Sequence, residues 1–192
     1  MNVLVESSSL TNIANAIRAK TNTTDTFKPS EMGAAIDGIK TDFFLKVANK
    51  VIDEVTAADL DGVVNLPRYI FYGCENLTKV EFPPSVQVIE TAAFNGCTAL
   101  EKLTIPPTVH TINAQVFQNS GVKALILCGD DVKTLSSANA ISYIAMRGAI
   151  FYVKPDTLSE EEVIEAYKAA TNWISYEENF APYSEYEVNN ND

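Results

Sequence analysis

The residues that could serve catalysis or metal binding are few in this 192-residue chain: one histidine, three cysteines and some short acidic runs. A nucleophile and base pair would have to be built around His110. The cysteines Cys74, Cys97 and Cys128, even with that histidine, match no spacing of a structural zinc site. We therefore predict no catalytic residue, no metal site and no cofactor.

The acidic runs have simpler explanations than catalysis. Glu160, Glu161 and Glu162 follow a serine, as negative charges at the start of a helix do. Asp130 and Asp131 follow a glycine and could ligate calcium, although an acidic turn without an ion is the commoner arrangement. No glycine-rich phosphate-binding loop is present in the sequence. These patterns favour recognition at a surface over chemistry in a cleft.

Composition excludes several other classes of protein. Lys and Arg total 14 against 25 Asp and Glu, for a formal charge of −11, which opposes binding to nucleic acid or to an anionic membrane. The region from Asp156 onward carries much of this charge, as an acidic cap or tail. No apolar run is long enough to cross a membrane and no signal peptide is recognisable, so we expect a soluble chain made in the cytoplasm, with reduced cysteines.

An internal repeat with an offset of 23 residues organises the middle of the chain. The aligned sets include Phe71, Phe94 and Phe117; Cys74, Cys97 and Ser120; and Leu66, Ile89 and Ile112. A unit this short cannot enclose a core, so each copy must be one coil of a solenoid that its neighbours cover. His110 aligns with Gln87 and Val64, a mixed set that indicates an ordinary surface residue. Stacked reduced thiols are expected at Cys74 and Cys97, with a disulfide between them as the alternative.

Alternating apolar and polar residues predict a strand in each coil, at 77–82 and 100–105. Stacked strands would form a parallel sheet, with the aligned phenylalanines filling the interior from the opposite wall. The outward positions form a face of mixed polarity, suited to contact with a protein or glycan; a plain solvated sheet is the alternative. The outward candidates are Lys79, Glu81, Lys102 and Thr104, then Ala124 and Ile126, and the exposed aromatic pair Tyr69 and Tyr72.

Residues 89–100, IETAAFNGCTAL, follow the pattern I-x-x-x-A-F-x-x-C-x-x-L and so resemble the BspA-type leucine-rich repeats. The resemblance covers about residues 47–127 and implies an α+β fold. We expect a short N-terminal helical hairpin, a leucine-rich-repeat solenoid of about three 23-residue coils and an α/β C-terminal cap. The predicted units are a helical module at 1–40, a linker at 41–46, the solenoid with its N-terminal cap at 47–127, and the cap with its acidic tail at 128–192.

The predicted C-terminal cap contains a helical stretch near 136–146, a strand at 149–153 and a helix after Ser159. A capping box joins Ser159 and Glu162. The inward stripe of this helix is expected to be Val163, Ala166, Tyr167 and Ala170, followed by an aromatic end wall of Trp173, Tyr176 and Phe180. Residues 151–186 resemble the C-terminal closure of such repeat proteins in phages and Gram-positive bacteria.

The N-terminal flank predicts two short helices whose apolar faces are too large to cover one another. Residues 10–20 and 27–32 resemble a module found at the start of virion proteins of tailed phages that infect Gram-positive hosts. We therefore expect an attachment or oligomerisation module. Its candidate binding residues are Leu10, Ile13, Ile17, Met32, Ile36 and Ile39.

Together these resemblances imply a non-enzymatic structural protein on the surface of a tailed-phage virion. The expected location is a capsid decoration or head fibre, or the tail tip or baseplate. Expected partners are other virion proteins, further copies of the chain in a homo-oligomer, and a host cell-surface protein or glycan, with no nucleic acid and no membrane insertion. The alternative is a bacterial BspA-like surface adhesin or interaction protein.

Overall fold

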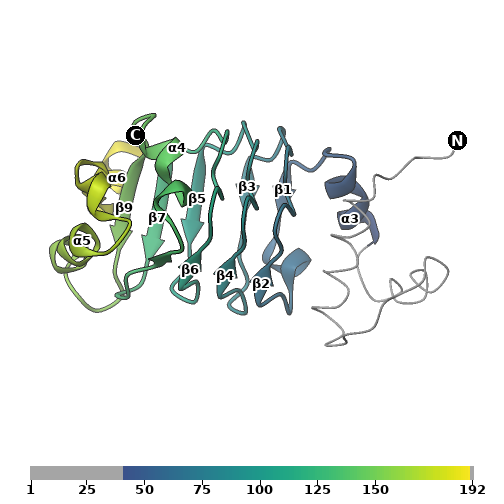
Figure 1. Cartoon of the computed structure of the whole chain (residues 1–192). Helices are drawn as coiled ribbons and strands as arrows, with labels where there is room; N and C mark the ends of the chain where they lie inside the picture. Colours follow the sequence, from purple (N-terminus) through teal and green to yellow (C-terminus); the bar gives the residue numbers. More distant parts are fainter. Residues whose placement is uncertain (1–40, 191–192) are drawn as a thin grey trace, which may run out of the picture.

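The computed structural model describes residues 41–190, which form a solenoid of stacked coils (Figure 1). Each coil contributes a short parallel strand to two columns. The first column contains β1 (Glu54–Val55), β3 (Lys79–Val80), β5 (Lys102–Ile105), β7 (Ala124–Cys128), β9 (Ile150–Lys154) and β10 (Phe180–Pro182). The second contains β2 (Asn65–Leu66), β4 (Val88–Ile89), β6 (Thr111–Ile112) and β8 (Thr134–Leu135). We call the exposed side of the first column the outer face.

The strand register reproduces the sequence repeat. Val88 pairs with Thr111, an offset of 23 residues, which confirms the period. Lys102 pairs with Ala124, one residue less, as the apolar positions after the third phenylalanine require. The strand predicted at 77–82 is shorter in the structure, since only Lys79–Val80 has strand geometry. The second column was not predicted, because two-residue strands have no period to detect.

The aligned apolar residues fill the interior between the two columns. Phe71, Phe94 and Phe117 are fully buried and stack in sequence, with ring centroids 5.4 Å and 6.1 Å apart. Cys74 and Cys97 are buried free thiols, and the Cys97 Sγ donates a hydrogen bond to the carbonyl oxygen of Phe71 at 3.1 Å. The predicted interior, including its stacked thiols, is therefore confirmed.

A left-handed backbone conformation recurs in the turns that join the two columns. Tyr69, Ala92 and Gln115, which share one repeat position, have φ of 60°, 57° and 57°. Each turn also bonds to the next coil: the Tyr69 N–H donates to Thr91 O at 3.1 Å, and the Ala92 N–H donates to Ala114 O at 3.0 Å. The third side of the solenoid is thus held by backbone hydrogen bonds and not by strands.

Helix α3 (Thr41–Ala48) lies at the N-terminal end of the described solenoid. Its Phe43 is buried and meets Phe71 edge-to-face, with centroids 6.4 Å apart. Residues 41–46, predicted as a linker, therefore lie in a helix that extends the aromatic stack. The 3-10 turn η1 (Ala57–Leu60) follows β1 and buries Leu60.

Beyond β7 the ladders continue through β8 and β9, so coils extend past the boundary predicted at residue 127. The remaining elements are η2 (Ala138–Ala140), α4 (Ser142–Ala145), α5 (Glu160–Ala169), η3 (Ile174–Asn179) and α6 (Tyr183–Asn190). The Ser159 and Glu162 capping box is present. The stripe predicted for α5 is wrong at Ala166, which is exposed: Ile164 is buried in its place, because Tyr167 turns toward Trp173 and Phe180 and sets the rotation of the helix.

The end wall is aromatic, as predicted. Trp173 is fully buried, its indole N–H donates to Lys133 O at 2.7 Å, and it meets Phe151 edge-to-face. Among residues 41–190, no helix has the length and apolar character needed to cross a membrane.

Candidate functional site

A groove of about 400 Å³ opens on the outer face where β3 lies beside β5. Its lining consists of Thr78, Lys79, Val80, Glu81, Phe82, Lys102, Thr104 and Pro106. Four of these residues, Lys79, Glu81, Lys102 and Thr104, are the outward positions singled out from the repeat. All four are exposed. The fold therefore brings together, around one depression, side chains that the sequence separates by more than twenty residues.

The groove follows a break between two sheets. Strands β1 and β3 form a two-stranded sheet, whereas β5 begins a separate sheet with β7, β9 and β10. At this break Phe82 is only half-buried, although it shares a repeat position with the fully buried Ile105. Its ring meets Phe94 edge-to-face at 6.2 Å, so the groove has an aromatic contact with the core. The alternation that predicts the strand at 77–82 places Phe82 on its inward side, in the repeat position of Ile105, so its part in the groove was not predicted.

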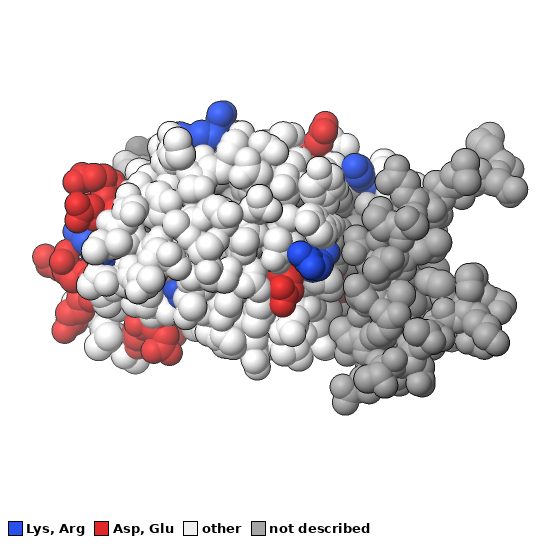
Figure 2. Space-filling model, in the orientation of Figure 1, with Lys and Arg blue, Asp and Glu red and all other residues white. Residues whose placement is uncertain are grey.

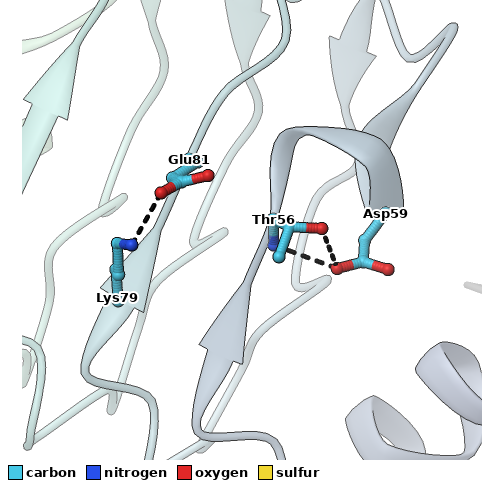
Figure 3. A network of polar contacts seen from close by, with 4 residues as sticks. All are labelled: Thr56, Asp59, Lys79 and Glu81. Carbon is cyan, nitrogen blue, oxygen red and sulfur yellow. Dashed lines mark hydrogen bonds and ion pairs between the residues drawn. The ribbon is translucent and has the colours of Figure 1, made fainter.

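Charges at the rim of the groove are paired along the strand. Figure 3 shows Lys79 of β3 and Glu81, just after the strand, pointing toward one another, with Nζ and Oε1 2.6 Å apart. The hydrogen bond that Lys79 donates to Glu81 and the negative charge of Glu81 together raise the pKa of Lys79 above its ordinary value. In the preceding coil the Asp59 carboxylate accepts hydrogen bonds from both the N–H and the hydroxyl of Thr56. The groove therefore combines a charged pair with the half-buried ring of Phe82 in its lining.

Helix α6 covers the outer face on the C-terminal side of the groove. Tyr186 contacts Tyr152 of β9, with centroids 5.0 Å apart, and the Lys102 Nζ of β5 lies 5.7 Å from the centre of its ring. Strand β7 runs between β5 and β9, so the Lys102 side chain and the Tyr186 ring meet across β7. Ile126 of β7 lies on the outward side of its strand, between Thr104 and Tyr152 in the register, but it is not part of an exposed face. It is buried, because Tyr186 of α6 packs on the neighbouring Tyr152 and covers this part of the sheet.

The predicted aromatic pair lies elsewhere. Tyr69 and Tyr72 belong to the segment between β2 and β3, and neither lines the groove. They are 40% and 50% exposed and meet edge-to-face at 5.9 Å. The outward candidates thus divide into a groove and a separate aromatic pair.

The residues considered for catalysis or metal binding make contacts with neighbouring residues of the fold. His110 is exposed, and its Nδ1 lies 3.0 Å from the Thr111 hydroxyl. Asp130 accepts hydrogen bonds from the N–H groups of Asp156, Thr157 and Leu158 and from the Thr157 hydroxyl, which secures the loop before α5. Within residues 41–190 no cluster of three His, Cys, Asp or Glu side chains is arranged to hold a metal ion.

The glutamates at the start of α5 also have structural partners. Glu160 accepts hydrogen bonds from the N–H and hydroxyl of Ser184, which joins α5 to α6. Glu162 completes the capping box with Ser159. Figure 2 shows acidic side chains gathered at the end of the molecule formed by these helices. The acidic C-terminal cap predicted from composition is therefore a feature of the folded surface.

The N-terminal candidates cannot be placed in this geometry. They are Leu10, Ile13, Ile17, Met32, Ile36 and Ile39, and they lie outside the described residues. The predicted attachment module at 1–40 therefore stays a prediction.

Comparison with known proteins agrees with the coil geometry. A search of curated proteins finds no match to the chain. The model of the BspA type leucine rich repeat region matches residues 31–143, which is more than half of the sequence and extends beyond residues 47–127 at both ends. Both the 23-residue strand register and this match lead to the same conclusion: the chain belongs to the BspA-type leucine-rich-repeat family.

Proposed function

We propose that this chain is a non-enzymatic structural protein on the surface of a tailed-phage virion, displaying its repeat domain outward to bind a host cell-surface protein or glycan. A BspA-type leucine-rich-repeat domain indicates a role in protein interaction or adhesion. The phage setting rests on the resemblances of the N-terminal and C-terminal flanks. The displayed location is a capsid decoration or head fibre, or the tail tip or baseplate.

The observation that carries the recognition role is the groove between β3 and β5. It combines an aromatic floor residue, Phe82, with a rim of Lys79, Glu81, Lys102 and Thr104. A partly buried aromatic residue surrounded by polar groups is typical of the energetic centre of a protein interface. The space of about 400 Å³ accommodates a few side chains of a partner.

A groove variant tests this role with the full-length chain. Thr104→Arg places a long side chain into the groove from an exposed strand position, so the core stays intact. Lys123→Ala is the matched control, because Lys123 is exposed and pairs with Glu101 outside the groove lining. We expect at least a tenfold loss of binding to host cell envelopes for Thr104→Arg and none for Lys123→Ala. Equal binding by both variants would exclude the groove as the recognition site.

In this proposal the N-terminal module at 1–40 attaches the chain to the virion. The same module joins copies of the chain into a homo-oligomer. Mass spectrometry and immunogold labelling of purified particles test the location directly. Detection on particles supports the virion role and separates head from tail. Detection on the bacterial envelope, with none on particles, supports the alternative of a bacterial surface adhesin or interaction protein.

A further inference from the structure

Four exposed residues of the first coil form a chain of alternating charge and aromatic contacts, which we call the first-coil cluster: Lys50, Arg68, Tyr69 and Tyr72. The Lys50 Nζ lies 5.6 Å from the centre of the Tyr72 ring, and the Arg68 guanidinium carbon lies 5.4 Å from that of Tyr69. The two rings meet edge-to-face at 5.9 Å. Cations at these distances are attracted to the electron-rich ring faces, so the four side chains hold one another in place.

Comparison between coils shows that the fold does not require these side chains. The matching residues are Thr91, Ala92 and Asn95 in the second coil and Ala114, Gln115 and Gln118 in the third. The backbone is nevertheless the same, with φ close to 60° at Tyr69 and at both of its counterparts. The same hydrogen bonds link successive turns. Arginine and two tyrosines at these positions therefore need an explanation other than coil formation.

Tyr69 in particular occupies an unfavourable position for its type. A left-handed φ is uncommon for residues other than glycine, asparagine and aspartate, and a bulky ring there is strained. The second coil fills the same position with alanine at φ 57°. The first coil instead keeps a large ring that is 40% exposed. Strain retained at an exposed aromatic residue is typical of a binding position.

We propose that the first-coil cluster binds an anionic carbohydrate. The apolar C–H face of a sugar ring packs on exposed tyrosine rings, and the corner formed by two rings at 75° offers one ring face beside one edge. Arg68 and Lys50 bring two positive charges to a chain whose formal charge is −11. A guanidinium pairs in two-pronged fashion with a carboxylate or a phosphate, so an acidic or phosphorylated sugar satisfies both halves of the cluster.

An acidic peptide fits this surface less well than a sugar. The N–H groups of Tyr69 and Tyr72 already donate to Thr91 O and Tyr69 O, at 3.1 Å each, and that of Ile70 donates to Pro67 O. A peptide could not add itself as a strand to a turn whose donors are engaged in this way. A sugar brings its own hydroxyl groups and needs only the side chains. The cluster is separate from the groove, and this inference does not depend on the proposed virion location.

Calorimetric titration of the full-length chain tests the inference with two anionic probes, a uronic-acid octasaccharide and a phosphodiester-linked oligosaccharide. Maltooctaose is the neutral arm and oligoglutamate the peptide arm. We expect one or both anionic saccharides to bind at least tenfold more tightly than either comparison probe, and more weakly as salt increases. The identity of the tighter anionic probe tells carboxylate from phosphate. The inference is overturned if neither saccharide binds, or if oligoglutamate binds as well.

Matched variants exchange residues between coils and so keep the backbone. Arg68→Thr and Tyr72→Asn introduce the residues of the second coil, and each should weaken saccharide binding at least fivefold. Tyr69→Ala provides a third variant with a residue already found at this φ. Lys123→Ala is the distant control and should bind as the parent does. Unchanged binding in all three cluster variants would place the saccharide elsewhere. Thr104→Arg changes only the groove, so it should bind the saccharide as the parent does.

Discussion

The rings of Phe94 and Phe117 lie nearly parallel, 6° apart in orientation, with centroids separated by 6.1 Å. Phe71 continues the stack on the other side of Phe94 at 5.4 Å. The three phenylalanines stack in space because they occupy the same position of the sequence repeat. Each ring is covered by the coils before and after it. Phe94 is central in this arrangement, with a phenylalanine on either side.

Truncation of Phe94 should be among the most destabilising single changes. Phe94→Ala leaves a cavity between two coils and is expected to reduce the free energy of unfolding by about 3–5 kcal/mol. Urea denaturation followed by circular dichroism measures this change. Tyr72→Ala is the control and should have little effect on unfolding, because the ring is half exposed. Equal losses for the two variants would contradict the assigned core.

Because Phe43 of α3 packs on Phe71, we expect the independently stable unit to begin at α3. Residues 41–192 should fold as a monomer that fails to attach to particles lacking the protein, because the module at 1–40 is missing. Residues 49–192 also lack α3, which exposes Phe71 and should lower the melting temperature. Light scattering, thermal melts and particle binding measure the three properties. Decoration of particles by residues 41–192 as efficient as that by the full chain would refute the attachment role of 1–40.

Asp130 should make the loop before α5 sensitive to acid. Hydrogen bonds from the Thr157 side chain, then from backbone N–H groups, lower the pKa of Asp130 from 3.8 to about 2. A carboxylate with a lowered pKa stabilises the fold above its unfolded pKa, and this contribution disappears as the pH falls from about 4 toward 2. Asp130→Ala should thus unfold more easily at neutral pH and lose less stability over that acid range. Unfolding curves from pH 2 to 7 test this, with Asp131→Ala as the control.

The three cysteines should differ in reactivity. Burial raises the pKa of Cys74 to about 11 and raises that of Cys97 further, while Cys128 is partly exposed. Iodoacetamide should therefore modify Cys128 first in the folded chain and all three after denaturation, as mass spectrometry can show. Rapid modification of Cys97 in the native state would contradict its place in the core.

We also expect the fold to need neither metal nor disulfide. A chelator and a reductant should each leave the melting temperature unchanged in thermal denaturation. A decrease of more than about 5 °C, of the order expected for losing roughly 1 kcal/mol, would reveal a structural bond that the described residues do not account for.

Removal of α6 should expose apolar surface on the outer face. Ile126 is buried beside Tyr152, on which Tyr186 of α6 packs. A chain ending at residue 182 should keep the phenylalanine stack but associate with itself, because an uncovered sheet face carrying Ile126 favours aggregation. Analytical ultracentrifugation detects this association, and Ile126→Thr in the shortened chain should reduce it. A monomeric shortened chain would show that α6 does not protect this surface.

Local repetition made much of the fold predictable. The positions of Phe71, Leu66 and Cys74 recur with a constant offset, and a constant offset has one simple packing solution: coils that cover one another. The same reasoning correctly identified Lys79 and Lys102 as outward neighbours. It did not predict the second column of strands or the helical structure of residues 41–46, whose partners lie in other coils.

The sequence by itself determined the period, the stacked phenylalanines and the capping box at Ser159, because these depend on spacing along one chain. Only the tertiary structure decided that Ile126 is buried, that Ala166 is not, and that Phe82 meets a groove. Each of these outcomes depends on a neighbour distant in sequence: α6 folding over β7, the aromatic end wall turning α5, and a break between the sheets of β3 and β5. Whether a residue is buried depends on which segment packs over it. For these residues that segment is distant in sequence, so burial is determined only in the folded chain.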